Sequence, residues 1–182
     1  MKTLQTALGL AWLVFWIYWL ASAVSAKASV AGGIQRRLPM TGLTALSVFV
    51  VVRVFRGGGL AVHSPILGAI GTVLFVSGLG FAIWARVHLG TNWGMPMTQR
   101  VEPELVTSGP YRFVRHPIYS GLLLAVVGTA LATNFLGLAV AVILGAYFYY
   151  AATVEERNLV AAFPTAYPAY REHTKKLIPF LL

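Results

Sequence analysis

Residues 118–153 read IYSGLLLAVVGTALAT-N-FLGLAVAVILGAYFYYAAT, and this stretch decides the fold. It holds two apolar runs without a charged residue, Ile118–Thr133 and Phe135–Thr153, which only Asn134 separates. Uncharged runs of this length suit a bilayer, and a break of one residue allows only a tight reversal of direction. The sequence therefore predicts two antiparallel membrane helices joined as a hairpin.

Three further apolar runs precede the hairpin: Leu4–Val24, Leu38–Val52 and Pro65–Ala85. The first is uncharged and, at 1.5 Å per residue, spans about 31 Å, which is the thickness of a hydrocarbon core. We expect it to be a retained span and not a cleaved leader. Pro65 suits the first turn of a helix.

The composition of the chain agrees with a membrane protein. Of its 182 residues 58% are hydrophobic and only 10% are charged, and the mean hydropathy is +0.74, whereas roughly a quarter of residues are charged in soluble domains. The fold class predicted is all-α: a polytopic integral membrane bundle of five transmembrane helices, with residues 1–182 in one domain. There is no cysteine, so neither a disulfide nor a thiolate metal site is possible.

The net charge of +9 is explained by membrane topology. With the C-terminus in the cytoplasm, eleven of the fourteen Lys and Arg residues lie on the inner side, and three (Lys2, Arg53 and Arg56) lie outside. This bias predicts a multi-pass protein of an inner or plasma membrane with an external N-terminus and a cytoplasmic C-terminus. The basic residues form no extended face, so nucleic-acid binding is not expected.

A polar cluster stands directly before the hairpin, in the sequence GPYRFVRHPIYSG at residues 109–121. Proline at the start of a helix costs no hydrogen bond, and the free N–H groups there carry partial positive charge. With Arg115 and His116 at this place, the segment predicts a pocket for an anion or polar ligand. The alternative is that Arg112 and Arg115 only anchor the helix at the membrane surface; the aromatic neighbours favour the pocket.

A second polar island follows the hairpin. The chain has five acidic residues, all glutamates, and two of them, Glu155 and Glu156, are adjacent at the expected end of the last span. A carboxylate there opposes the helix macrodipole, so a cation is expected beside it. Nearby arginines, or a ligand with an amino or sulfonium group, would supply that cation; a solvated pair at the interface is the alternative. Two polar islands joined by one hairpin predict one site.

Two other features leave alternatives open. The tail at Phe163–Arg171 is either an amphipathic helix at the membrane surface or a cap over the cytosolic mouth of the bundle. Small residues recur in the predicted spans and are expected to allow close helix packing. They are Gly68, Gly71, Gly78, Gly80, Gly121, Gly128, Gly137 and Gly145.

Three motifs follow one another in order: LVTSGPY at residues 105–111, RHPxYxG at 115–121, and the glutamate pair followed by FxxxYxxY at 163–170. This combination resembles the isoprenylcysteine carboxyl methyltransferase family and the related phospholipid N-methyltransferases. The resemblance runs from about residue 78 to the end of the chain. The first two apolar runs match only as hydrophobic segments, so residues 1–64 would be an N-terminal two-helix part and 65–182 the catalytic part.

The resemblance implies an integral membrane methyltransferase that uses S-adenosyl-L-methionine, releases S-adenosyl-L-homocysteine and acts at the cytosolic face. The acceptor stays open between the carboxylate of a prenylcysteine-like molecule and a lipid amine; the oligomeric state also stays open, and no metal is expected. The resemblance implies catalytic roles for Arg115 and Glu156. It implies cofactor contacts by Val106, Gly109, Tyr111, His116, Pro117, Tyr119, Glu155 and Glu156.

One position departs from the pattern, because the family's Phe-Gly reads Phe163-Pro164 here. This leaves the geometry of the C-terminal cap open.

Two other functions compete with the methyltransferase. A membrane NADPH-dependent reductase of the sterol type resembles the C-terminal half and would need a 2′-phosphate pocket, with Arg112 and Arg171 as candidates. A transport or scaffold protein would bind neither cofactor.

Overall fold

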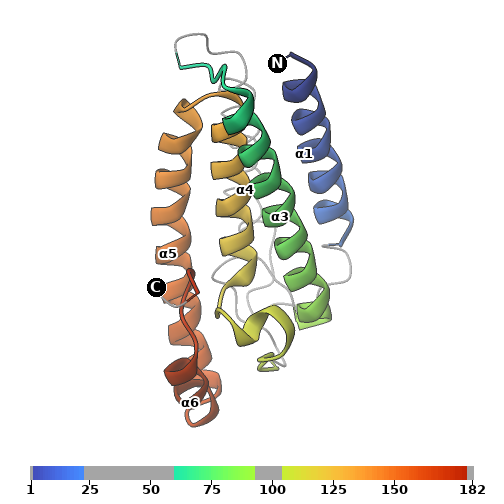
Figure 1. The fold of residues 1–182 in the computed structure, drawn as a ribbon. Helices are drawn as coiled ribbons and strands as arrows, with labels where there is room; N and C mark the ends of the chain where they lie inside the picture. Colours follow the sequence, from blue (N-terminus) through green and yellow to red (C-terminus); the bar gives the residue numbers. More distant parts are fainter. Residues whose placement is uncertain (1, 23–59, 93–103, 180–182) are drawn as a thin grey trace, which may run out of the picture.

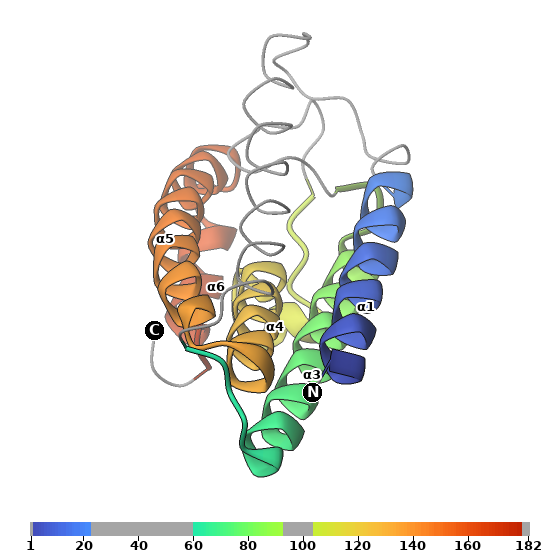
Figure 2. The same ribbon diagram turned by 90° about the horizontal axis from the view of Figure 1, so that it is seen from above.

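The computed structural model describes residues 2–22, 60–92 and 104–179, and within these ranges the chain is helical, without a β-strand. The long helices lie side by side in one bundle (Figures 1 and 2). The elements are α1 (Lys2–Ser22), α3 (Pro65–Leu89), the 3-10 turns η3 (Gly90–Asn92) and η4 (Gly109–Arg112), α4 (Pro117–Thr133), α5 (Leu136–Ala162) and α6 (Ala166–His173).

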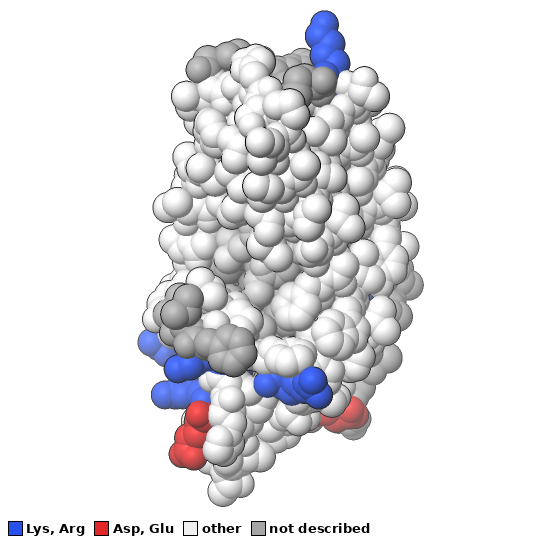
Figure 3. Space-filling view, in the orientation of Figure 1, with Lys and Arg blue, Asp and Glu red and all other residues white. Residues whose placement is uncertain are grey.

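Three of these helices, α1, α3 and α5, are long and apolar enough to cross a membrane, and α4 is a shorter apolar helix. The charged side chains visible in Figure 3 gather near one end of an otherwise uncharged surface, apart from a basic side chain at the opposite end. Five successive spans require the first and third to run in the same direction, and α1 and α3 do so (Figure 1). The expected second span, Leu38–Val52, lies outside the described residues.

The described helices begin within two residues of the expected positions, but α3 and α5 extend beyond their expected C-terminal ends, α3 from Ala85 to Leu89. Pro65 opens α3 after Ser64, whose side chain accepts a hydrogen bond from the N–H of Leu67. The last span was expected to end at Thr153, but α5 continues to Ala162. Glu155 and Glu156 therefore lie within a helix and not at its end, and that part of the prediction is wrong. Hydropathy marks where the apolar surface ends, whereas a helix can continue into a polar environment.

Close contact between α3 and α4 forms the centre of the bundle. A Cβ atom on Gly71 would lie 2.5 Å from the backbone oxygen of Gly128, and one on Gly78 would lie 2.6 Å from that of Gly121. The two pairs have the same spacing along their helices, so the backbones touch twice. The packing role is confirmed for these four glycines, whereas a Cβ atom on Gly80 would meet no atom of the described residues within 4 Å.

The reversal between α4 and α5 is fixed by Asn134. Its side-chain oxygen accepts a hydrogen bond from the N–H of Leu136 at 2.8 Å. The turn also pairs with the segment before α3, because Val62 donates to the carbonyl of Thr133 at 2.9 Å and Phe135 donates to that of Leu60 at 3.0 Å. The predicted hairpin is confirmed, and its turn is tied to the first residues of the α3 region.

Helix α1 packs against α3 and α4 through a buried hydrogen bond and an aromatic cluster. The indole N–H of Trp12 donates to the hydroxyl of Thr129 on α4 at 3.0 Å, and the Trp12 ring lies edge-on to Phe75 of α3. At the other end of α1, Arg86 of α3 donates to the carbonyl of Ser22 at 2.5 Å. A buried indole needs a hydrogen-bond acceptor, so Thr129 fixes the depth at which α1 lies.

Candidate functional site

The site begins with the segment before α4, which the end of the chain holds in place. The N–H of Arg115 donates to the carbonyl of Lys175 at 2.8 Å, and the N–H of His116 donates to that of Lys176 at 3.1 Å. The Ser120 hydroxyl donates to the carbonyl of Leu177 at 2.5 Å. Residues 174–177 form backbone hydrogen bonds but no regular β-strand; this segment, called the tail strand below, thus lies alongside the Arg-His-Pro segment. This arrangement favours the cap interpretation of the tail over a separate surface helix.

Two further contacts fix α6 and the tail strand. Arg115 Nη1 donates to the carbonyl of Thr174 and, at 3.4 Å, to that of Arg171. The Tyr170 hydroxyl donates to the carbonyl of Tyr111 in η4 at 2.5 Å. Pro164, the departure from the family pattern, lies in the turn between α5 and α6, and α6 still forms behind it.

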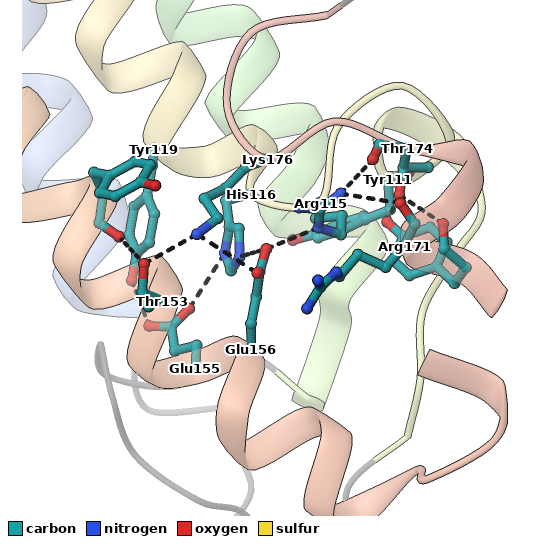
Figure 4. Close-up of polar contacts among 12 residues, drawn as sticks. Tyr111, Arg115, His116, Tyr119, Thr153, Glu155, Glu156, Arg171, Thr174 and Lys176 are labelled. Carbon is teal, nitrogen blue, oxygen red and sulfur yellow. Dashed lines mark hydrogen bonds and ion pairs between the residues drawn. The ribbon is translucent and has the colours of Figure 1, made fainter. Parts of the chain in front are cut away.

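Both glutamates of α5 face the Arg-His-Pro segment (Figure 4). Arg115 Nε donates to Glu156 Oε1 at 2.7 Å, and both side chains are only 8% exposed. His116 lies between the carboxylates, with Nδ1 3.4 Å from Glu155 Oε2 and Nε2 3.4 Å from Glu156 Oε1. The Tyr119 hydroxyl donates to Glu155 Oε1 at 2.5 Å. The two polar islands of the sequence therefore form one cluster.

Lys176 of the tail strand supplies a second cation to the same carboxylate. Its Nζ lies 3.6 Å from Glu156 Oε2, donates to the Thr153 hydroxyl at 3.0 Å, and sits 4.4 Å from the centre of the Tyr149 ring. Arg115 and Lys176 thus hold Glu156 from two sides. A buried carboxylate held in this way has a fixed position and a compensated charge.

An aromatic stack borders the cluster on the side of the hairpin. The rings of His116 and Tyr119 are parallel with centres 5.6 Å apart, and those of Tyr119 and Phe148 are parallel at 4.6 Å. Leu177 of the tail strand is buried in the same hydrophobic cluster. The stack links the polar groups to the apolar part of the hairpin.

Two pKa shifts describe the electrostatics of this region outside the spans. Burial by itself would lower the pKa of His116, but its contacts with Glu155 and Glu156 outweigh burial and raise that pKa above its ordinary value. Burial raises the pKa of Tyr170 to about 12, so its hydroxyl remains a donor to Tyr111 at physiological pH. The cluster therefore favours the charged imidazolium over the neutral ring.

A cavity of about 440 Å³ opens beside the cluster and is called the basic pocket below. Figure 4 shows Arg171 reaching from α6 toward Glu156 in this region. The pocket is lined by Arg115, Arg157, Arg171, Lys176, Glu156, Thr153 and Val160. Four cations and one carboxylate give its wall a net positive charge.

The structure brings most of the expected site residues together, but not all. Arg115, His116, Tyr119, Glu155 and Glu156 are in mutual contact as described. Pro117 opens α4 beneath them, and the Tyr111 carbonyl is bound by Tyr170.

Val106 and Gly109 make no described contact with the glutamates. Gly109 has a positive φ of 59°, and a Cβ atom there would lie 2.2 Å from the His88 ring. The positive φ and the neighbouring His88 ring thus explain why residue 109 is a glycine, independently of any contact with a cofactor.

Sequence reasoning missed Lys176, Thr153 and the backbone pairing of the tail strand. The basic pair at 175–176 was used only to assign topology. The signal that could have drawn attention to it is the apolar Leu177, which follows directly and is 4% exposed.

Comparison with known proteins points to one family. The family model described as "Phospholipid methyltransferase" matches residues 66–166, which is more than half of the chain. Protein-S-isoprenylcysteine O-methyltransferase of Schizosaccharomyces pombe is 38% identical over 79 residues, covering 42% of this chain and 34% of the relative. The cobalt-zinc-cadmium resistance protein CzcN of Cupriavidus metallidurans is 32% identical over 106 residues, covering 57% of this chain and 49% of the relative.

A solved structure has a similar fold. The eukaryotic intramembrane Ras methyltransferase ICMT (isoprenylcysteine carboxyl methyltransferase) superimposes with a TM-score of 0.57 at 22% identity, over 84% of this chain and 55% of that one. The matches span from about a third to about half of the length of these proteins. At this level of identity the structural likeness concerns the fold alone.

Proposed function

The chain belongs to the phospholipid methyltransferase family, and from this premise we propose that it transfers a methyl group from S-adenosyl-L-methionine to a lipophilic acceptor. The observation that carries the proposal is the cluster of the buried Arg115, His116 and Glu156 side chains with the partly exposed Glu155 at the mouth of a membrane hairpin. Charged groups next to a bilayer are costly and are therefore a functional hypothesis by default. The family and its relatives give no support to the reductase alternative.

The groups present fit the methyl donor. The carboxylates of Glu155 and Glu156 suit an amino group, Arg115 suits a carboxylate, and the stack of His116 and Tyr119 offers a flat surface to a ring. We assign cofactor contacts to these residues, with Tyr111 and Pro117 shaping the wall. Val106 and Gly109, both before α4, are retained as cofactor contacts on the basis of the resemblance alone.

When bound, the cofactor supplies an electrophilic methyl group on a sulfonium. The reaction is an in-line displacement, so the protein has to align the partners and exclude water. Arg115 and Lys176 keep the Glu156 carboxylate fixed, and Leu177 closes the aromatic side against solvent. A carboxylate acceptor needs no base; for an amine acceptor, Glu156 is the candidate base, because the raised pKa of His116 favours the protonated ring, which cannot accept a further proton.

The proposal places this chemistry at the cytosolic face of the membrane. The cofactor is water-soluble and would enter from the cytosol, and the acceptor would enter from the bilayer between the apolar helices. The uneven distribution of Lys and Arg supports a cytoplasmic C-terminus, and α6 and the tail strand lie at the same end as the cluster (Figure 1).

Isothermal titration of the detergent-purified protein with S-adenosyl-L-methionine and S-adenosyl-L-homocysteine tests the cofactor site. Wild type should bind both, and Glu156→Gln and His116→Ala should bind them at least roughly tenfold more weakly, as expected when a charged hydrogen-bond partner is lost. Glu172→Gln is the matched control, because Glu172 is exposed on α6. It should bind like wild type.

Transfer of radiolabel from the methyl group to extracted membrane lipids and to a farnesylcysteine analogue would then identify the acceptor class. Absence of cofactor binding by folded wild type, in detergent and again in lipid nanodiscs, would overturn the proposal. Binding of NADPH without S-adenosyl-L-methionine would return the reductase to first place.

A further inference from the structure

The segment before α4 carries two arginines, and the site uses only one of them. Arg115 binds Glu156, whereas Arg112 belongs neither to that cluster nor to the wall of the basic pocket. Within the residues that the structure describes, Arg112 has no ion pair with a carboxylate. Its guanidinium carbon instead lies 4.6 Å from the centre of the Phe113 ring. An exposed cation at the end of the bundle that carries the cluster therefore remains available to a ligand.

The residues on either side of Arg112 and Phe113 turn these two side chains outward. Tyr111 and Val114 are buried, whereas Arg112 is exposed and Phe113 is 39% exposed. Val114 also pairs with Lys175 of the tail strand. The buried neighbours thus hold the segment in place, and Arg112 and Phe113, called the η4 tip below, project from it.

The η4 tip lies beside the end of α3, where another aromatic side chain is exposed. A Cβ atom on Gly109 of η4 would touch the His88 ring, and Trp84 lies edge-on to His88 with the ring centres 5.6 Å apart. Trp84 is 43% exposed. Exposed aromatic rings at the end of an apolar span are typical of the level at which lipid head groups lie. We therefore expect the η4 tip at the head-group level of this leaflet.

The chemistry of the η4 tip selects a phosphate without an accompanying cation. A guanidinium presents N–H donors in its own plane, and their spacing matches the oxygens of a phosphate. Contact with the Phe113 ring uses one face of the guanidinium and leaves these donors free. A choline lipid brings a cation together with its phosphate, whereas an anionic phospholipid does not. The tip should therefore prefer the anionic lipid.

The η4 tip is connected to the site through the backbone on both sides. Tyr111, directly before the tip, accepts a hydrogen bond at its carbonyl from the hydroxyl of Tyr170 on α6. Val114, directly after the tip, is followed by Arg115 and His116 of the cluster. A lipid that favours this arrangement of residues 109–114 therefore also favours the arrangement of the site, and thermodynamic linkage makes such coupling reciprocal.

We propose that the η4 tip binds the phosphate of an anionic phospholipid of the surrounding membrane, and that this lipid strengthens binding of the methyl donor. The second part rests on the proposed methyl transfer, whereas the first part does not. The lipid is held by its head group on the outer surface of η4, so it is distinct from the methyl acceptor. Arg112 is a positioning residue, because it acts on the site through η4. Surface anchoring alone, the alternative raised by the sequence, would require no choice between lipids.

Lipid preference is measured next to the tip with the full chain in phosphatidylcholine nanodiscs. The chain has no natural cysteine, so a fluorophore on Ser108→Cys, an exposed position at the start of η4, reports locally. Quenching is compared for phosphatidylglycerol and phosphatidylcholine that carry a nitroxide near the head-group end of an acyl chain. The labelled protein should prefer phosphatidylglycerol roughly fivefold, as expected for one basic residue at the membrane surface, and added salt should weaken the preference.

Variants in the same labelled background separate the tip from the general charge of the protein. Arg112→Gln should lose the preference, and Arg112→Lys should keep part of it, because the charge remains without the paired donors. Lys2→Gln, which removes an exposed cation at the other end of the bundle, is the matched control and should keep the full preference. Soluble glycerol 3-phosphate at the concentration of the labelled lipid should not displace that lipid.

Titration with S-adenosyl-L-methionine in nanodiscs with and without phosphatidylglycerol measures the coupling. The affinity of the protein with the natural Arg112 should rise roughly fivefold or more when phosphatidylglycerol is present. Arg112→Gln should show the lower affinity in both membranes. Because linkage is reciprocal, the cofactor should also increase the preference for phosphatidylglycerol by the same factor.

Equal quenching by the two lipids, or a preference that survives in Arg112→Gln, would overturn the lipid site. Displacement by glycerol 3-phosphate would also overturn it, since the tip would then bind free phosphate. A lipid preference without any change in cofactor affinity would overturn the coupling. A protein that prefers phosphatidylglycerol but binds no S-adenosyl-L-methionine in either membrane would count against the methyltransferase and support the lipid site, so the two failures are distinguishable.

Discussion

Glu156 is the residue on which the contacts of the site converge. It lies against Arg115 and His116 before α4 and against Lys176 of the tail strand. These partners come from segments far apart in the sequence, so one carboxylate joins the start of α4 to the end of the described chain.

Replacing Glu156 by glutamine should therefore affect stability as well as cofactor binding. The change keeps the shape of the side chain but leaves Arg115, which is 8% exposed, without its charge partner. Removing one member of a buried pair costs on the order of 3 kcal/mol. Chemical unfolding in detergent should show this loss, while the exposed Glu172→Gln should leave the midpoint unchanged. Equal midpoints for both variants would contradict a structural role for the pair.

The raised pKa of His116 gives stability a dependence on pH. Contacts with the two glutamates favour the protonated ring, so the stabilisation is fully present below the unfolded pKa of about 6.5 and is lost as pH rises through the higher folded value. The difference in melting temperature between wild type and His116→Gln should thus shrink from about pH 6 to pH 9. Subtracting one melting temperature from the other removes the contribution of groups that titrate equally in both proteins. A difference that grows with pH would show that the neutral ring is the favoured form.

At the scale of elements, the α3–α4 contact can be tested with two glycines of α3. Gly78 faces the backbone of α4, whereas Gly80 does not. A Cβ atom on Gly78 would lie 2.5 Å from the backbone nitrogen of Ala125, whereas one on Gly80 would meet nothing within 4 Å in the part of the chain that the structure describes. Gly78→Ala should destabilise the protein by about 1–3 kcal/mol through overpacking, and Gly80→Ala should be neutral or slightly stabilising. Thermal unfolding followed by tryptophan fluorescence checks this order. Equal effects would mean that the two helices are not in contact at Gly78.

The tail strand offers a similar matched pair. Leu177 is 4% exposed against the aromatic stack, whereas its neighbour Ile178 is 49% exposed. Leu177→Ala should cost on the order of 2 kcal/mol and loosen Lys176 and the Arg-His-Pro segment, so cofactor affinity should fall with it. Ile178→Ala should change neither quantity, as titration and unfolding of both variants would show. An unaffected Leu177→Ala variant would mean that the strand does not support the site.

Element by element, hydropathy predicted the positions of the described long helices because each apolar run has to be covered by lipid or by protein. It did not predict that α5 continues to Ala162, since residues beyond the apolar run lack the signal that hydropathy uses. It also did not separate Gly78 from Gly80, because both are small residues on the same helix and only the facing backbone distinguishes them.

At the scale of the whole molecule, the convergence of the Arg-His-Pro segment and the glutamate pair followed from the hairpin, because an antiparallel pair brings its two outer ends together. The participation of Lys176 did not follow, since a flexible tail can place a lysine at many points along the surface. Long-range contacts of this kind depend on how elements pack and leave little trace in local sequence.

Orientation in the membrane is a property of the whole molecule, and the lack of natural cysteine makes it easy to measure. Thr3→Cys and Glu172→Cys each place a thiol at an exposed position near opposite ends of the bundle. A membrane-impermeant maleimide should label the first variant in intact cells and the second only after permeabilisation, as the Lys and Arg distribution predicts. The reverse pattern would place the site on the other side of the membrane.

The pairing of the tail strand with the Arg-His-Pro segment also has a consequence for biosynthesis. A ribosome makes residues 109–121 before α5, and the tail strand after both. The membrane hairpin can thus insert while the backbone partners of Arg115 and His116 are still to be translated. Under the proposed function, each nascent chain should remain inactive until the tail strand has emerged and folded back, so incompletely translated copies left in the membrane would not consume the methyl donor.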